Sequence, residues 1–249
     1  MLLEGKVAAI YGGGGSIGGA VARAFAREGA TVFLAGRHQP SLDGVSTTIR
    51  DAGGSAETAI VDALDEASVN GFVDRLTGKT GRLDISFNVI GLQDVQAALA
   101  DLSVDDFLKP IVTAMRSQFL TTQAAARTMI PQGTGVILTF GGSGPQTLPG
   151  LGGLKVALDA VAGLRRQWAC ELGEHGIRVI TLKTGGIPET LPEGFPGRDA
   201  IVSGIQDATL LKRAATLADV GTVAAWAASD LARTITSTEI NISAGGIVD

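Results

Sequence analysis

Residues 7–18 read VAAIYGGGGSIG, a short apolar run that leads directly into a glycine loop. The run at residues 7–10 is typical of a buried strand, and residues 17–28 have the period of a helix that stops at Gly29. A glycine turn between a strand and a helix presents unpaired backbone N–H groups and the positive end of the helix dipole. The sequence therefore predicts a phosphate-binding turn, with a ligand-free turn as the alternative. Its expected contact residues are Gly12, Gly14, Gly15, Ser16, Ile17 and Gly18.

Apolar runs alternate with helix-period segments along the rest of the chain. Strands are expected at residues 7–10, 31–35, 58–61, 83–89, 135–140, 177–182 and 239–243, and helices at residues 17–28, 67–78, 105–129, 154–174 and 217–229. The strands are continuous apolar runs, which indicates a sheet covered on both faces. The pattern predicts an α/β protein with a three-layer, doubly wound parallel sheet, the Rossmann fold, as a single domain over residues 1–249. The Gly- and Pro-rich segment 185–212 is a candidate substrate lid.

Composition narrows the classes of function. The net charge is −5 and no run of Lys or Arg occurs, so we expect neither a nucleic-acid nor an anionic-membrane partner, and no metal site. The single cysteine, Cys170, excludes an intramolecular disulfide framework, and we expect it to pack in the core. The first residues lack the pattern of a secretory signal, and no apolar run approaches the ~18–20 residues of a membrane span. We therefore expect a cytoplasmic protein that acts on a small-molecule substrate.

The end of the second expected strand predicts the cofactor. Residues 33–38 read FLAGRH, and Gly36 stands where a site for NAD(H) would place a carboxylate against the ribose 2′-hydroxyl. Arg37 follows it, and a guanidinium can pair with a 2′-phosphate through two hydrogen bonds. We therefore expect NADP(H) rather than NAD(H). His38 either adds to the same pocket or is an exposed loop residue.

Several motifs, in this order, resemble the short-chain dehydrogenase/reductase family over nearly the whole chain. The glycine loop resembles TGxxxGxG, with Tyr11 in place of the threonine and Ser16 in place of the middle glycine. The sequence NVIG at residues 88–91 stands where the family has NNAG, and ELGEHGIRV at 171–179 and ISAGG at 242–246 also match. Lys155 matches the family lysine.

The resemblance implies further cofactor contacts. It places Asp62 and Ala63 against the adenine, although Asp62 could instead cap the following helix. It also implies that Asn88 and Gly91 lie beside the cofactor, that Ile187 offers its backbone to the carboxamide, and that Lys155 binds the nicotinamide ribose.

The catalytic positions depart from the family pattern. The family uses Asn, Ser, Tyr and Lys, and the first three positions here hold Ala114, Gly142 and Leu151. The catalytic candidates are therefore Lys155 and Ser143, which stands one residue after the serine position. A positioned acid is worth ~10²–10⁴-fold in rate, so ordinary ketone reduction should be slow.

These observations favour an atypical NADP(H)-dependent oxidoreductase that acts on a small carbonyl or an activated alkene. Two alternatives stay open. One is a non-catalytic NADP(H)-binding protein that serves as a sensor or partner subunit, and the other is a non-redox lyase or isomerase. The long segments 105–129 and 154–174 resemble the helices that pair between subunits in this family, which implies a homodimer or homotetramer.

Overall fold

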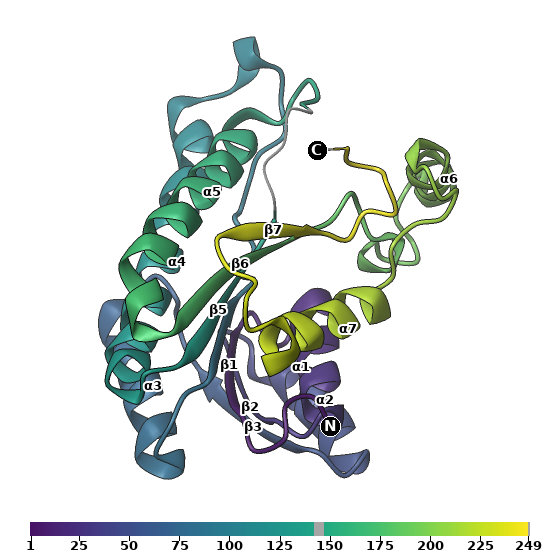
Figure 1. Ribbon diagram of the computed structural model, residues 1–249. Coiled ribbons are helices and arrows are strands. Elements are labelled where there is room, and N and C mark those ends of the chain that lie inside the picture. The colour runs from purple at the N-terminus through teal and green to yellow at the C-terminus, as the bar shows by residue number, and fades with distance from the viewer. Residues whose placement is uncertain (142–146, 249) are drawn as a thin grey trace.

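The chain folds around one parallel sheet, shown in Figure 1. The computed structural model describes residues 1–141 and 147–248. Within them the sheet has 7 strands in the order β3-β2-β1-β4-β5-β6-β7. The strands are β1 (Val7–Tyr11), β2 (Thr31–Gly36), β3 (Ser55–Ile60), β4 (Ile85–Asn88), β5 (Gly135–Phe140), β6 (Ile177–Lys183) and β7 (Thr238–Asn241). The strand order reverses its direction between β1 and β4, so a crevice is expected at the carboxyl ends of these two strands.

Helices cover both faces of the sheet (Figure 1). One face carries α1 (Ser16–Arg27), α2 (Gln39–Asp51) and α7 (Leu217–Ala228), and the other carries α3 (Glu66–Thr80), α4 (Val104–Gln132) and α5 (Gly152–Leu172). Alternate residues of β1 divide between the two cores: Ile10 packs with Phe25 of α1, whereas Ala9 packs in the core that holds Phe72 of α3. The prediction of a three-layer, doubly wound single domain is confirmed.

Two α-helices, α2 and α6, were not expected from the sequence. Residues 39–51 form α2 although Pro40 and Gly44 interrupt its helical pattern, and the segment 185–212 contains the short η3 (Pro188–Thr190) and α6 (Arg198–Ala208). None of the α6 residues is buried, so this helix packs no face into the core. In Figure 1 α6 stands away from the sheet, near the C-terminal end of the chain.

The expectation for Cys170 is wrong. The thiol lies on an exposed face of α5, whereas the nearby Trp168 and Leu172 turn inward to the core. Apolar residues surround Cys170 in the sequence, but helical geometry places it on the opposite side from them. In the described part of the chain, no helix combines the length and the apolar character needed to cross a membrane.

Candidate functional site

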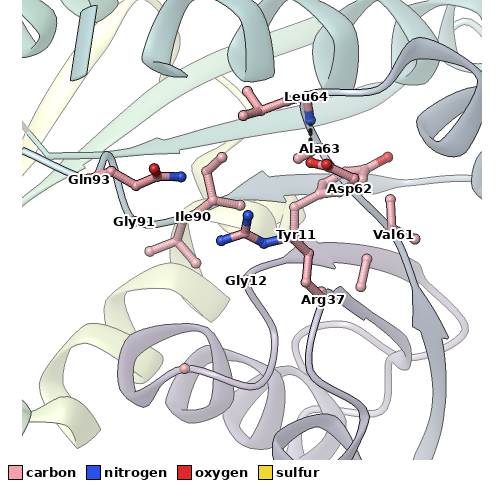
Figure 2. Close-up of a pocket in the computed structure, with 14 residues that line it drawn as sticks. Tyr11, Gly12, Arg37, Val61, Asp62, Ala63, Leu64, Ile90, Gly91 and Gln93 are labelled. Atoms are coloured by element: carbon pink, nitrogen blue, oxygen red, sulfur yellow. Dashed lines mark hydrogen bonds between the residues drawn. The ribbon is translucent and has the colours of Figure 1, made fainter. Parts of the chain in front are cut away.

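A cavity of about 440 Å³ opens at the carboxyl ends of β1, β2 and β4, where the strand order reverses (Figure 2). Its volume and position fit a ligand site of a doubly wound sheet. The lining residues come from four segments of the chain: Tyr11, Gly12, Gly15, Ala35, Gly36, Arg37, Val61, Asp62, Ala63, Leu64, Val89, Ile90, Gly91 and Gln93. Six of the expected cofactor residues, Gly12, Gly15, Arg37, Asp62, Ala63 and Gly91, are among them.

The glycine loop is fixed by its backbone. The N–H groups of Gly12 and Gly13 both donate to the carbonyl oxygen of Ala35, at 2.9 and 3.2 Å. Gly12 has a φ of +83°, and a Cβ atom there would lie 2.8 Å from the carbonyl oxygen of Val89. A Cβ atom on Gly18 would collide with the Gly12 carbonyl oxygen, so glycine is required at both positions.

The start of α1 can receive an anion. Its N-cap is Gly15, and no side chain caps it, so the first-turn N–H groups are available to a ligand. Ser16 is exposed at the first helical position. Gly14, Ser16, Ile17 and Gly18 shape this turn without lining the cavity. Their direct contact with phosphates stays a prediction.

Arg37 supplies positive charge at the rim of the cavity. It directly follows Gly36 at the end of β2, it is exposed, and it makes no hydrogen bond or ion pair with any other described residue. Figure 2 shows its guanidinium reaching across the cavity toward Ile90. His38 does not line the cavity; its Nδ1 lies 2.7 Å from Ser41 Oγ at the start of α2.

Asp62 and Ala63 form the side of the cavity that follows β3. The N–H of Leu64 donates to Asp62 Oδ1 at 3.0 Å, which is the dashed line in Figure 2. Asp62 is not the cap of α3, so that alternative is wrong. Asp65 is the N-cap, and its carboxylate accepts from the N–H of Ser68 at 2.6 Å. Asp62 is therefore left at the cavity wall, with its carboxylate exposed.

Asn88 does not line the cavity; it lies buried at the end of β4, behind the residues that do. Its side chain is buried, donates from Nδ2 to Thr121 Oγ1 at 3.1 Å, and accepts from the N–H of Ile90 at 3.3 Å. These bonds tie α4 to the segment 89–91, which lines the cavity. Asn88 thus positions the neighbours of Gly91.

Of the expected catalytic residues, Lys155 does not line this cavity. Lys155 lies near the start of α5, and its Nζ donates to Asp159 one turn later. Ile187 is buried at the N-cap of η3, away from the cavity lining. Ser143 lies outside the described residues, as does Gly142. Ala114 is fully buried in an apolar cluster with Ala157 and Val161.

Two polar features of this edge of the sheet were not predicted from the sequence. Tyr11 lines the cavity, its hydroxyl is buried without a partner, and burial raises the pKa of the phenol. Lys183, at the end of β6, is buried and pairs with Glu239 at 3.3 Å, and Glu239 also pairs with Arg165 of α5 at 3.3 Å. A lysine directly after the expected strand at residues 177–182 was the available signal for the second feature.

Comparison with known proteins decides the family. The family model described as enoyl-(acyl carrier protein) reductase matches residues 13–246. The chain belongs to the short-chain dehydrogenase/reductase family. It is 30% identical to YxbG, an uncharacterized oxidoreductase of Bacillus subtilis, over 98% of this chain and 91% of that protein. It is 32% identical to secoisolariciresinol dehydrogenase of Forsythia intermedia, over 98% of this chain and 89% of that protein.

Solved structures agree with this assignment. A short-chain dehydrogenase/reductase from Serratia marcescens superposes with a TM-score of 0.89 at 26% identity, over 99% of each chain. The broad part of the prediction from sequence is thereby confirmed: this short-chain dehydrogenase/reductase is an oxidoreductase of a family that binds a nicotinamide dinucleotide.

Proposed function

We propose that this short-chain dehydrogenase/reductase is an NADP(H)-dependent oxidoreductase that acts on a small carbonyl or an activated alkene. The observation that carries the choice of cofactor is the end of β2. There Gly36 offers no carboxylate to a ribose 2′-hydroxyl, and Arg37 extends over the cavity a guanidinium that pairs with no other described residue. A guanidinium favours a 2′-phosphate, whereas a carboxylate would repel it.

The cavity accommodates the adenosine half of such a cofactor. Residues 12–18 and the uncapped start of α1 would hold the pyrophosphate, and Arg37 would hold the 2′-phosphate. The adenine would lie against Asp62 and Ala63. The exposed carboxylate of Asp62 can accept a hydrogen bond from the adenine amino group. When bound, the dinucleotide supplies or accepts a hydride.

The chain's own groups for proton transfer are few. Lys155 would hold the ribose of the nicotinamide half after exchanging its contact with Asp159, and Ser143 or solvent would carry the proton. Leu151, just before α5, has no proton to give. We therefore expect slow turnover of plain ketones and faster turnover of activated alkenes, which need less help from an acid. The segment 185–212 would cover the substrate.

The test is titration of the purified protein with NADPH and NADH, repeated for Arg37→Ala. Because hydrogen bonds between charged groups are worth about 1.5–3 kcal/mol, we expect the variant to bind NADPH about 10–100-fold more weakly and NADH unchanged. Arg75→Ala, an exposed arginine of α3, is the matched control and should bind both as the parent protein does.

Each result bears on a different part of the proposal. Equal loss of NADPH and NADH, or no loss of either, would contradict the role of Arg37. Failure of the parent protein to bind either cofactor would overturn the proposal as a whole. A screen of enones and small carbonyls with the bound cofactor then tests catalysis. Tight NADPH binding without any turnover would favour a sensor or partner subunit instead.

A further inference from the structure

A second cavity, of about 550 Å³, lies between the C-terminal halves of α1 and α2. It shares no lining residue with the cavity at the carboxyl ends of the strands, and it opens at the opposite edge of the sheet, where β2 and β3 begin. Its lining combines Arg23 and Arg27 with the exposed apolar residues Met1 and Ala52, and Ala26 and Ile49 lie buried behind them. The volume is in the range of small-molecule sites.

The two arginines lack negative partners. They stand four residues apart on α1, so their side chains share one face of the helix. Neither makes a hydrogen bond or ion pair with another described residue, and the described lining of the cavity contains no Asp or Glu. Burial, followed by the charge of Arg27, lowers the pKa of Arg23. An arginine nevertheless keeps its proton, so this pair carries two uncompensated charges.

The helix dipole explains the position of only one of these two arginines. Arg27 lies in the last turn of α1, where a cation interacts favourably with the helix dipole. Arg23 lies one turn earlier, beyond the reach of that effect, and it is half-buried. A half-buried guanidinium beside a second cation, facing a cavity, has the features of an anion site that a ligand would complete.

The rest of the cavity is suited to an apolar group. The chain comes close to α1 at Gly54, where a Cβ atom would lie 2.8 Å from Ile49 Cγ2 and 3.1 Å from Ala26 Cβ. Glycine at this position lets the turn after α2 close over these side chains. The accessible apolar lining next to the two charges therefore comes from Met1 and Ala52.

We propose that this cavity binds a small amphiphilic anion. Its phosphate or carboxylate head would be held by Arg23 and Arg27, and its short apolar tail would lie against Met1 and Ala52. Guanidinium groups bind both kinds of head through paired, charge-assisted hydrogen bonds. This site is independent of the nicotinamide cofactor and of the proposed reaction.

The probe is octyl phosphate, titrated calorimetrically into the full-length protein saturated with NADPH, so that the glycine loop cannot bind it. We expect binding that weakens at least about tenfold in Arg23→Gln and in Arg27→Gln, and that is unchanged in Arg75→Gln. Inorganic phosphate, which lacks the tail, should bind more weakly than octyl phosphate, whereas octanoate should compete with it. Arg27 is exposed, so its variant serves if Arg23→Gln fails to fold.

The outcome separates this site from the first one. Binding that persists in both arginine variants would overturn the proposal, as would binding that NADPH abolishes or that Arg37→Ala removes. Absence of any binding by the parent protein would also overturn it. Unchanged NADPH affinity in Arg23→Gln shows that the variant is folded, and this readout holds whether or not the protein has enzymatic activity.

Discussion

At the scale of single residues, Tyr11 has a structural place in the fold. It is the only tyrosine of the chain, and it ends β1 beside the glycine loop. The side chain is 1% exposed, and its ring meets Phe72 edge to face with 5.5 Å between centroids. The hydroxyl has no partner among the described residues. Its burial raises the pKa of the phenol, which makes it a poor proton donor.

We expect Tyr11→Phe to leave the free energy of unfolding unchanged or to raise it by up to ~1 kcal/mol, because it removes a buried hydroxyl that makes no hydrogen bond. Urea unfolding measures this. Thr121→Val is the control, since the Thr121 hydroxyl is also buried but accepts from Asn88; that variant should lose about 1–3 kcal/mol. Equal losses in the two variants would show that the Tyr11 hydroxyl is satisfied after all.

At this scale the sequence predicted the cofactor side of the cavity better than the catalytic side. Gly12, Arg37 and Asp62 could be placed because each follows the end of a parallel strand, and those ends converge at one edge of the sheet. Lys155 could not, because its position on a helix leaves open which partner its flexible side chain takes. In the structure that partner is Asp159.

At the scale of elements, α7 shows a helix start that local sequence fixes. The N–H of Asp219 donates to Thr216 Oγ1 at 3.1 Å, and the N–H of Thr216 donates to Asp219 Oδ2 at 2.9 Å. This reciprocal capping box satisfies two backbone N–H donors at the N-terminus of α7. The hydrogen bonds from Thr216, first from its backbone and then from its hydroxyl, lower the pKa of the Asp219 carboxyl.

Asp219→Ala should therefore destabilise the protein by about 0.5–1 kcal/mol at neutral pH. Because the pKa of Asp219 is lower in the folded state, its contribution is present above the unfolded-state pKa and disappears as the pH falls through the folded-state pKa. The difference from the parent protein should thus shrink in acid. Denaturant unfolding across this range measures it, with Asp74→Ala, an exposed aspartate of α3, as the control. A deficit that does not change with pH would contradict the capping role.

The two α-helices that the sequence did not reveal, α2 and α6, escaped prediction for different reasons. In α2 the buried residues Leu42, Val45, Ser46 and Ile49 follow helical spacing, but the segment also contains Pro40 and Gly44, which are typical of turns. In α6 no residue is buried at all. Periodicity detects a helix through the face that it buries, so α1 was predictable and α6 was not.

At the scale of the whole molecule, helices α4 and α5 leave an apolar surface uncovered. On α4, Leu108, Val112 and Phe119 are 43%, 57% and 50% exposed, and on α5 Val156 is 43% exposed. The spacing of the three α4 residues puts them on one face of that helix. Helices α4 and α5 pack against each other, so their outer faces together form a broad surface. We propose that a second copy of the chain covers it, in a homodimer or homotetramer.

We expect sedimentation of the parent protein to give a dimer or tetramer, and Val112→Asp to weaken its association by about 10–100-fold, because the interface would bury a charge without a partner. The variant should stay folded, since Val112 is exposed in the single chain. Leu231→Asp, at a 68% exposed leucine near the end of α7, is the control and should sediment as the parent does. A parent protein that stays monomeric at all concentrations would rule out this interface. An unchanged sedimenting mass for Val112→Asp would show that the interface does not include this face of α4.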